Sequence, residues 1–554
     1  METPQDHPRF IQGVRRRELL QASLAAGVAL PAWSFSHAPA LWAAAAGQPK
    51  RGGILRVPGL DPPHFDPHLT FNFRTHTTLS FIYSKLVRYR VGAGTAPGIF
   101  RIEPDLAERW DTPDDTTYVF HLRHGVHWQN KPPVNGRELV AEDVKFTFDR
   151  FLAEPANPLR YMLEPVDRVE VVDHYTVKFL LKEPYVWLLD VLATSKAMWI
   201  IAREVVEQFG DLKPAESAIG TGPFLLERYE PNVKTVFKRN PAYFLTDQPY
   251  VDGVEWLVIT DPSTGLAMYR TGQLDTGPGG NWTVRQQDLE SLKQSHPQWL
   301  YQDFLFTNSW RLFMRTDQPP FNDVRVRRAL SQAIDRQALI EAVWGRGEPT
   351  GAVPRGLTEW SLPVDQLGVG AKYYHYDPQE ARRLLAEAGF PKGFSTPLHA
   401  TGGFGPDGLD AVQLVQHYLK DVGIAAELKL QEFGAFMDTT RLGKFEGMAM
   451  GPYPPGWEPD SILYGSYAPD SRLNISHVDD PALTAMLKAQ RRTQDLEARK
   501  QRIFDIQRYE AEQQYYVYLA CPMLTGSHQP YVKNYAANSL EEYGMAAAVL
   551  WLDR

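Results

Sequence analysis

The sequence predicts an α/β protein with more than one domain. Segments that alternate like β-strands are interspersed with segments that carry the start and stop signals of helices. The chain has 554 residues, enough for two or three domains with separate cores. Apolar residues make up 43% and charged residues 22% of the chain, as in ordinary globular proteins. We therefore expect a folded multidomain chain without a disordered bulk.

Residues 1–46 are predicted to be an export signal rather than part of the fold. Arg15–Arg17 precede an apolar stretch at 19–35, and Ala43–Ala46 offers the small residues of a cleavage site. The arginines resemble those of a twin-arginine signal, although Gln21 departs from the usual lysine and leaves the Sec route open. An uncleaved N-terminal anchor is the alternative. We expect a soluble periplasmic protein without a lipid anchor, because no cysteine follows the apolar stretch.

Local patterns place one strand and two helices. Residues 117–123 alternate between two faces and are predicted to form a strand. Asp377 is the expected N-cap of a helix that has Pro378 at its first position and ends at Gly389. Asp323 is the expected cap of a second helix. The apolar stripe of that second helix consists of Val326, Leu330, Ala333, Ile334 and Ile340.

Charge and cysteine content narrow the possible partners. The formal net charge is -8 and no basic run interleaves with aromatic residues, so no nucleic-acid partner is expected. Cys521 is the only cysteine, so no intramolecular disulfide can form. No segment beyond the signal has the ~20 uninterrupted apolar residues of a membrane span, so no stable membrane insertion is expected after cleavage. Residues 491–512 mix both signs of charge and are predicted to form a solvated helix face.

Three histidines invite a metal-site interpretation. His121, His124 and His127 recur at every third position. Residues three apart on a strand point to opposite faces, so one metal ion could collect all three only if the chain turned sharply at Gly125. Solvated turn histidines are the simpler interpretation. We predict no metal site and no cofactor.

The GFGPDG sequence at Gly403–Gly408 fits the G-x-G-x-x-G pattern, between an expected strand at 394–400 and an expected helix at 409–419. Asp407 would place a carboxylate against the phosphates of a dinucleotide, and Pro406 removes a backbone N–H group. We therefore predict a flexible turn. The sequence motifs of serine hydrolases, zinc proteases and P-loop enzymes are missing, so we predict no catalytic residue and no enzyme.

Ordered sequence blocks carry a family resemblance. The segment Glu103–Arg150 contains PDLAERW, YVFHLRHGVHW and AEDVKFTFDR. The other blocks, in chain order, are KRGGIL (Lys50–Leu55), FDP (Phe65–Pro67), GTGPF (Gly220–Phe224), RNPAYF (Arg239–Phe244), GQLD (Gly272–Asp275), PPFNDVRVRRALSQAIDR (Pro319–Arg336) and YDPQEARRLLAEAGF (Tyr376–Phe390). In these blocks the chain resembles family 5 of the extracytoplasmic solute-binding proteins, which includes the oligopeptide, dipeptide and nickel receptors of ABC importers.

The resemblance implies a two-lobed periplasmic-binding-protein fold of type II, with an extra subdomain inserted in the first lobe. The implied boundaries are 47–92, 216–306 and 515–554 for lobe I, 93–215 for the inserted subdomain and 307–514 for lobe II. Two chain crossings between the lobes, near 306 and 514, would form a hinge that lets the cleft close on a ligand.

The resemblance also implies which residues contact the ligand. The implied ligand-binding residues are Phe71, Asn72, Phe73, Asn281, Trp282, Asn308, Trp310, Tyr453 and Trp457. For each aromatic residue among them, ordinary core packing is the alternative interpretation.

One departure from the family concerns the ligand. Peptide receptors of this family carry an acidic residue three positions before an acidic-Pro pair, and that residue holds the α-amino group of the peptide. Glu458-Pro459 supplies the pair here, but the earlier position is Pro455, and Pro452 replaces a family aromatic. A peptide could still bind through its backbone. Peptide is therefore the expected ligand, with an oligosaccharide or another hydroxylated solute as the alternative.

The resemblance implies a monomeric receptor that delivers its solute to ABC permease subunits without chemical change. An exported hydrolase is a second possibility, which the missing catalytic motifs oppose. A periplasmic chaperone or sensor partner with the same fold is a third. Nickel binding occurs in this family, although the three histidines are not its expected site.

Overall fold

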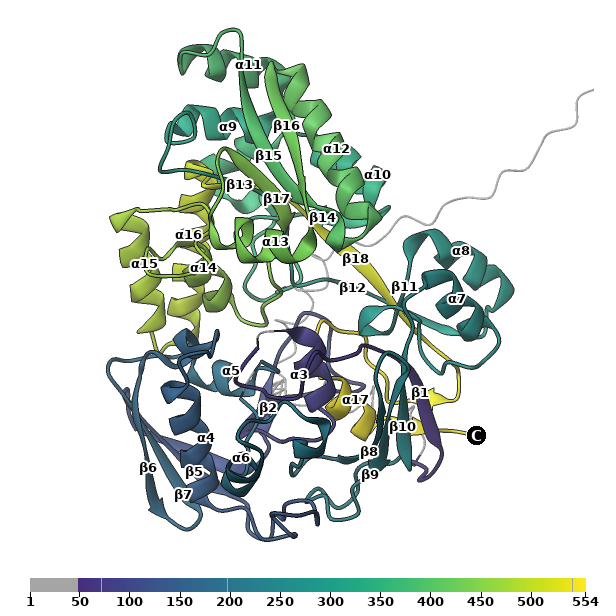
Figure 1. Cartoon of the computed structure of the whole chain (residues 1–554). Helices are drawn as coiled ribbons and strands as arrows, with labels where there is room; N and C mark the ends of the chain where they lie inside the picture. Colours follow the sequence, from purple (N-terminus) through teal and green to yellow (C-terminus); the bar gives the residue numbers. More distant parts are fainter. Residues whose placement is uncertain (1–47, 71, 197, 541) are drawn as a thin grey trace, which may run out of the picture. The chain divides into compact units, whose positions relative to one another are not determined.

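The computed structural model of the chain describes residues 48–70, 72–196, 198–540 and 542–554, which belong to one compact unit. The export signal predicted for residues 1–46 lies outside the described residues, as does Phe71. The described part contains three sheets of four or more strands and two smaller two-stranded sheets. Figure 1 shows helices against the larger sheets.

The first sheet has four strands in the order β1-β10-β9-β8. β1 (Ile54–Gly59) runs parallel to β10 (Gly253–Val258), and β9 (Lys234–Arg239) runs antiparallel to β10 and to β8 (Phe224–Glu230). We call it the β1 sheet. Its first strand therefore pairs with a segment about 200 residues further along the chain.

The second sheet, the β5 sheet, is entirely antiparallel, with the order β4-β5-β7-β6. Its strands are β4 (Ala107–Asp114), β5 (Thr117–Leu122), β7 (Thr176–Leu181) and β6 (Val166–Asp173). The predicted strand is confirmed as β5, one residue shorter than expected. Helix α4 (Ala141–Ala153) packs its apolar face on this sheet. The sheet is formed entirely by residues between 107 and 181, so its contacts are comparatively local.

The third sheet, the β13 sheet, has eight strands. Its main path is β11 (Thr283–Val284), β18 (Tyr516–His528), β13 (Trp310–Met314), β17 (Met448–Pro452), β15 (Phe394–Thr401) and β16 (Ile424–Gln431). β12 (Leu300–Leu305) and β14 (Gly347–Pro349) also pair with β18.

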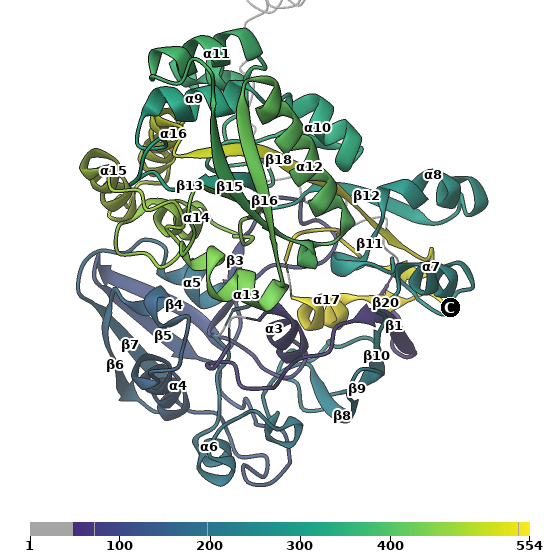
Figure 2. The ribbon, with the colours of Figure 1, turned by 45° about the horizontal axis from the view of Figure 1, so that its top comes forward.

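Helices cover both faces of the β13 sheet. Leu312 and Met314 pack in a core with residues from α9 (Val324–Gln332), α10 (Arg336–Val343), α11 (Pro378–Glu387) and α12 (Pro406–Asp421). On the opposite face, Arg311 contacts Ser466 of α14 (Pro459–Tyr467). Figure 2 shows α14 with α15 (Pro481–Arg491) and α16 (Leu496–Gln513) beside the sheet.

β18 is 13 residues long and pairs with two different groups of strands. Its first half pairs with β13 and β14, and its second half pairs with β12 and β11. The two halves meet at Cys521, whose buried Sγ lies 2.7 Å from the carbonyl oxygen of Phe306. The polypeptide between β12 and β13 runs alongside this point, so two chain segments pass side by side here.

The remaining elements connect these sheets. They are α3 (Phe73–Leu79), β2 (Val87–Tyr89), β3 (Ile102–Pro104), α5 (Leu188–Ala193), α6 (Arg203–Phe209), α7 (Pro262–Arg270), α8 (Gln286–Ser295), α13 (Phe433–Asp438), β19 (Val532–Lys533), α17 (Tyr543–Val549) and β20 (Trp551–Leu552).

The helix predicted from Asp377 is confirmed as α11. The Asp377 side chain accepts hydrogen bonds from the backbone N–H groups of Gln379 and Glu380, and Gly389 follows the helix with a φ of 96°. A left-handed φ of this kind favours glycine, because a Cβ would clash with the neighbouring carbonyl.

The single helix predicted from Asp323 to Ile340 is wrong in its length. Asp323 caps α9 as expected, but α9 ends at Gln332 and α10 begins at Arg336. The break arises because Asp335 caps a new helix, accepting from the backbone N–H of Ala338 at 3.0 Å. Both short helices still place their apolar side chains in the same core.

The solvated helix predicted for residues 491–512 is also corrected. α15 ends at Arg491, and α16 begins only after Asp495, which caps it. Arg491 forms a 2.8 Å ion pair with the buried Asp460, and Glu510 is fully buried. The mixture of charges predicted a solvent-exposed helix face, but Arg491 and Glu510 point toward the interior of the protein.

Candidate functional site

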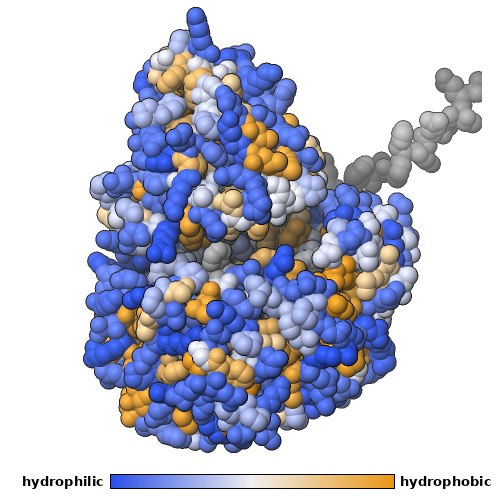
Figure 3. Space-filling view, viewed as in Figure 1, coloured by the Kyte–Doolittle hydropathy of each residue, from blue (hydrophilic) through white to orange (hydrophobic). Residues whose placement is uncertain are grey.

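Two cavities lie between the β13 sheet with its helices and the rest of the described chain. The larger has a volume of about 790 Å³. Leu266 of α7, Gly280 and Tyr543 line it from one side, and Trp344 and Asp407 line it from the other. Figure 3 shows the surface hollowed between these parts of the molecule. Cavities of 300–1,000 Å³ are typical of ligand sites.

The smaller cavity, which we call the Trp457 pocket, has a volume of about 60 Å³. Its walls come from Tyr89 of β2, from residues 161–162, from residues 190–196 around the end of α5, and from residues 453–462. Segments more than 250 residues apart therefore meet around one pocket, which has room for a small chemical group.

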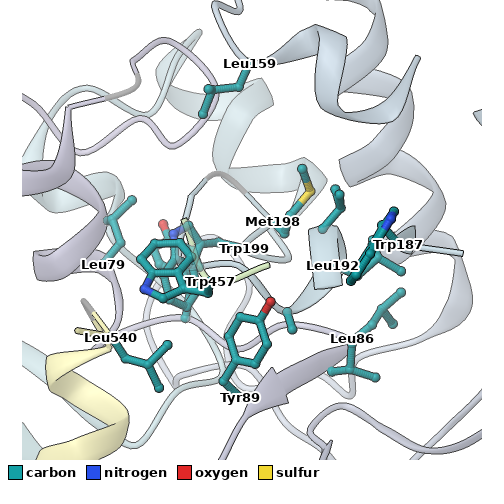
Figure 4. Close-up of a cluster of buried hydrophobic side chains, with 14 of the residues drawn as sticks. Leu79, Leu86, Tyr89, Leu159, Trp187, Leu192, Met198, Trp199, Trp457 and Leu540 are labelled. Atoms are coloured by element: carbon teal, nitrogen blue, oxygen red, sulfur yellow. The ribbon is translucent and has the colours of Figure 1, made fainter. Parts of the chain in front are cut away.

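Aromatic side chains form much of the wall of this pocket. The Trp457 ring is buried, and its Nε1–H donates a hydrogen bond of 3.1 Å to the carbonyl oxygen of Ser539. Figure 4 shows Trp457 and Tyr89 within a cluster of buried apolar side chains that includes Leu540, and the two rings lie 6.5 Å apart. Tyr161 leaves 49% of its surface exposed although it lines the pocket, so its ring is available for stacking.

Lys196 brings a positive charge to the Pro455 position. Its ammonium group donates to the carbonyl oxygen of Pro455 at 3.1 Å and lies 5.0 Å from the centre of the Trp457 ring. The ammonium thus makes a cation–π contact inside the pocket. A cation therefore lies beside Pro455, the position where the resemblance implies a carboxylate in peptide receptors.

Two carboxyl groups also line the pocket. Burial and the nearby charge of Asp460 raise the pKa of the Glu458 carboxyl to about 8. Burial raises the pKa of the Asp190 carboxyl to about 7, while the hydrogen bond from the Tyr89 hydroxyl opposes that rise. Glu458 also caps α14, accepting from the backbone N–H of Ser461. Burial of both carboxyls disfavours their charged forms.

Tyr453, another of the predicted ligand-binding residues, lines the same pocket, and its ring lies close to two cations. The guanidinium carbon of Arg311 lies 4.0 Å from the centre of the Tyr453 ring, and that of Arg441 lies 5.8 Å from it. Arg441 belongs to the short 3-10 helix Thr440–Leu442 after α13. Tyr453 and Trp457, both predicted to bind the ligand, thus lie in the wall of the same pocket.

The other predicted contact residues lie elsewhere. Asn72 caps α3 through a hydrogen bond from the backbone N–H of Arg74, and the Phe73 side chain is 45% exposed. The backbone N–H of Asn281 donates to the Tyr543 hydroxyl at 2.6 Å, and Tyr543 lines the larger cavity. Trp282 is buried against Tyr543, with ring centroids 5.3 Å apart.

Asn308 and Trp310 line neither cavity. Trp310 is buried in the core of the β13 sheet, 5.6 Å from Trp344, which does line that cavity. The Asn308 side-chain oxygen is buried with no partner among the described residues. For Trp310 and Trp282 the structure therefore shows the packing that the sequence left as the alternative.

The three histidines contact neighbouring residues of the fold. Nε2 of His121 lies 2.8 Å from the Asp111 carboxylate, the His124 ring packs on Tyr175, and Nδ1 of His127 lies 2.9 Å from the carbonyl oxygen of Gly136. No cluster of three or more metal-ligating side chains occurs in the described ranges.

The Gly403–Gly408 segment joins β15 to α12. Gly405 has a φ of 89°, and Pro406 occupies the first turn of the helix.

Among the helices of the described ranges, none is long and apolar enough to cross a membrane.

The sequence analysis did not predict that Tyr161, Asp190 and Lys196 line the Trp457 pocket. It also did not predict the contact between Arg441 and the Tyr453 ring. The first three come from the segment inserted between β5 and β8, which no local motif links to residues 453–458. Arg441 precedes the apolar strand β17, but a basic residue before an apolar strand is too common in sequences to predict a contact with Tyr453.

Comparisons with known proteins agree on one family. Residues 101–474 match the model described as "Bacterial extracellular solute-binding proteins, family 5 Middle". The chain is 30% identical over 469 residues to di/tripeptide-binding protein 1 of Pseudomonas aeruginosa (strain UCBPP-PA14), covering 79% of this chain and 82% of that protein.

Solved structures agree with this match. The periplasmic binding protein DppA from Helicobacter pylori, in complex with the peptide STSA, has a TM-score of 0.76 at 26% identity, covering 91% of this chain and 99% of that one. AgaA from A. tumefacien R10, in complex with agropinic acid, has a TM-score of 0.75 at 22% identity, covering 91% of this chain and 99% of that one, and shares the fold.

Proposed function

The chain belongs to family 5 of the bacterial extracellular solute-binding proteins and has their two-lobed α/β fold of type II, and on that premise we propose that it captures a peptide for an ABC importer. The names of the similar proteins, di/tripeptide-binding protein 1 and the DppA complex with STSA, support a peptide ligand.

The observation that carries the proposal is the position of the cavities. Both have walls contributed by residues between 307 and 514 on one side and by residues from the rest of the described chain on the other. With the boundaries expected from the sequence, we assign the first side to lobe II and the second to lobe I with its inserted subdomain. A solute between them contacts both lobes and therefore favours the closed arrangement.

The hinge of this closure is proposed at the two segments that pass side by side near Phe306 and Cys521. β18 is continuous there, and its pairing changes from β13 and β14 to β12 and β11. A small rotation about this strand would separate the two sides of both cavities. Hinge closure around a ligand is a common device of periplasmic binding proteins.

The proposed peptide site lacks a carboxylate at Pro455 for the peptide α-amino group. The local cation Lys196 already donates to the carbonyl oxygen of that residue. Acetylation of the peptide N-terminus should therefore cost below about 1 kcal/mol in binding free energy, because no carboxylate is left unpaired. Calorimetry on a matched free and acetylated pair measures this, and a hundredfold loss on acetylation would mean that Glu458 or Asp460 holds the amine.

A non-peptide solute is the second candidate, favoured by the same substitution of Pro455 and by the aromatic pocket wall. Aromatic rings present apolar faces on which a sugar ring or another hydroxylated solute can stack. The AgaA complex shows that the fold accommodates agropinic acid in that protein. Mass spectrometry of the solute that co-purifies with the protein separates the two candidates.

We propose that the protein performs no chemistry on its solute. Incubation of purified protein with a defined peptide mixture, followed by mass spectrometry, should return every peptide at its original mass. Appearance of cleavage products that disappear in a heat-inactivated control would support the exported-hydrolase alternative.

We also propose export through the twin-arginine route and delivery to permease subunits from the periplasm. Replacing Arg16 and Arg17 by lysine should block processing of the precursor if this route is used. Normal processing of the double variant would assign export to the Sec route.

A further inference from the structure

We propose that the inserted subdomain, residues 93–215, is a clasp that docks on lobe II and stabilises the closed arrangement of the two lobes. The inference rests on the proposed receptor function and on its lobe boundaries. It deepens that function, because it assigns part of the affinity for solute to residues that line neither cavity. Closure on a solute belongs to the proposed function, and the role of the inserted subdomain in that closure is the new element.

The first observation is a buried polar contact between the residues just before α5 and the C-terminal end of α15. Trp187 is 2% exposed, and its Nε1–H donates to the side-chain oxygen of the fully buried Gln490 at 2.8 Å. The backbone N–H of Val186 donates to the carbonyl oxygen of Arg491 at 3.0 Å. In Figures 1 and 2, α14 and α15 lie next to the part of the chain that carries α5. We call this contact the clasp interface.

A buried carboxylate organises the same interface from the side of lobe II. Asp460 of α14 is 1% exposed and accepts from the Arg491 guanidinium at 2.9 and 3.0 Å and from the Gln490 side-chain amide. The Tyr185 hydroxyl donates to the same carboxylate at 3.4 Å. Opening of the interface would bring the Trp187 ring into water, so burial of that ring favours the docked state.

A second contact continues the interface toward residues 356–360. The Arg101 guanidinium makes a bidentate pair with the Glu359 carboxylate, at 2.5 and 2.6 Å. The neighbouring Trp360 ring lies 5.2 Å from the Trp187 ring, edge to face. The clasp interface therefore joins two separate stretches of the inserted subdomain to three stretches of lobe II.

The inserted subdomain is held to lobe I by other buried contacts. The Arg150 guanidinium of α4 pairs with the fully buried Asp66 at 2.6 Å, and the same carboxylate accepts from the backbone N–H of Leu212 at 3.0 Å. The Lys85 ammonium donates to the carbonyl oxygen of Ala193 at 2.7 Å. The subdomain therefore moves with lobe I, so that rotation about the proposed hinge parts the clasp interface.

The clasp changes the affinity through the closure equilibrium. The apparent affinity of a solute for the closed arrangement scales with the fraction of molecules that is closed. Contacts in the clasp interface raise this fraction, and the solute raises it further. Trp187, Gln490 and Arg491 line neither cavity, so their effect on affinity needs no contact with the solute.

The test reverses two exposed ion pairs at the rim of the clasp interface, Arg101–Glu359 and Glu183–Arg492. The repelling variant, Arg101→Glu with Glu183→Arg, places like charges opposite each other at both pairs and keeps the net charge. The restored variant adds Glu359→Arg and Arg492→Glu. The control variant Arg109→Glu reverses an exposed charge on β4 of the same subdomain, outside the interface.

Two measurements are made on protein stripped of solute by unfolding and refolding. Hydrogen exchange follows the backbone N–H of Val186, whose hydrogen bond crosses the interface. Small-angle X-ray scattering measures the radius of gyration. We expect exchange at Val186 to be about tenfold or more faster in the repelling variant, with a larger radius of gyration. The restored variant and the control should both match wild type.

Wild-type exchange at Val186 and a wild-type radius of gyration in the repelling variant would overturn the inference, as would failure of the restored variant to recover. Amides of the β5 sheet should keep their wild-type exchange, and their loss of protection would show a purely structural role that contradicts the clasp. Should the repelling variant fail to fold, Trp187→Phe, which removes the N–H donor to Gln490 and keeps an aromatic ring, decides the question by the same two measurements.

Calorimetry with alanyl-leucine links the clasp to affinity. The repelling variant should bind this dipeptide about tenfold more weakly than wild type, and the restored variant should recover the wild-type affinity. Equal affinity in a repelling variant that has opened would overturn the assigned effect on affinity. Binding of alanyl-leucine to neither wild type nor variants would contradict a dipeptide solute, while exchange and scattering would still decide on the clasp.

Discussion

Trp457 contributes to the pocket both a ring surface and a fixed position. The hydrogen bond from its Nε1–H to Ser539 holds the ring beside Tyr89, and the Lys196 ammonium also contacts the ring. Buried aromatic anchors of this kind contribute more to binding than their neighbours, because they exclude water and lose little conformational freedom.

Replacing Trp457 by alanine should therefore weaken solute binding by about 2 kcal/mol or more. Trp457→Phe, which keeps an aromatic ring but loses the hydrogen bond, should lose less. Calorimetry with a solute that binds wild type measures both, and Tyr376→Ala, at an exposed ring away from the cavities, is the control. Unchanged affinity in a folded Trp457→Ala protein would contradict the site assignment.

The sequence predicts Trp457 and Tyr453 as ligand-binding residues, but it does not reveal that Lys196 and Asp190 line the same pocket. The loop 453–458 stands out because it departs from the family pattern at Pro455. Lys196 and Asp190 belong to a segment more than 250 residues away, and only the folded chain brings them to this loop. Trp310, also predicted to contact the ligand, is buried in the core of the β13 sheet, and its contact with a solute stays a prediction.

Two histidines, His68 before α3 and His76 within it, are buried in neutral form. His68 is fully buried and neither ring nitrogen has a partner among the described residues. Burial, aided by the positive charge of Arg150 and opposed by Asp66, lowers the pKa of His68 to about 3. Burial lowers the pKa of His76 to about 4, although its contact with the Thr70 carbonyl opposes the shift.

Acid should therefore destabilise the fold between pH 6.5 and about pH 4. The folded-state pKa values lie below those of the unfolded chain, so the unfolded state binds more protons in this range and gains stability as pH falls. Above pH 6.5 the effect vanishes. His68 alone should cost about 2 kcal/mol of unfolding free energy between pH 7 and pH 5.

Denaturant unfolding at pH 7 and pH 5 measures this loss. His68→Gln should reduce the difference between the two pH values, whereas the exposed His417→Gln should leave it unchanged. An identical pH dependence in wild type and His68→Gln would show that His68 is not neutral and buried in solution.

At the level of elements, cap residues determined what the sequence could predict. Local signals predicted the helix caps Asp377 and Asp323 and the strand at 117–122. Helix caps and the alternation of apolar and polar residues both depend on residues that are close in the sequence. The helix break at Asp335 was missed because the apolar stripe continues through it. The inward-facing charges Arg491 and Glu510 were missed because their burial depends on α14 and on the β13 sheet, which local patterns do not reveal.

A buried ion pair connects two segments that are more than 450 residues apart in the sequence. Lys85, just before β2, pairs with Glu542, just before α17, and both side chains are almost completely buried. The Lys85 ammonium also donates to the carbonyl oxygen of Ala193 at 2.7 Å. The pair therefore fixes the C-terminal segment against β2 and α5, on the same side of the cleft as Tyr89.

Lys85→Met should destabilise the protein by about 3–5 kcal/mol, because it leaves the Glu542 carboxyl buried and unpaired. The double variant Lys85→Met with Glu542→Leu should recover much of that loss. Denaturant unfolding measures both, with Lys145→Met as control, since the exposed pair of Lys145 with Asp149 contributes roughly 0.3–0.5 kcal/mol. Equal losses for Lys85→Met and Lys145→Met would contradict this account.

For the whole molecule, the central claim is that a solute draws the two lobes together about the segments near Phe306 and Cys521. Small-angle X-ray scattering on solute-stripped protein, with and without a saturating solute established by calorimetry, measures this directly. We predict a smaller radius of gyration in the bound state, and no such change in the presence of a peptide that does not bind. An unchanged radius of gyration at saturation would contradict closure of the lobes on the solute.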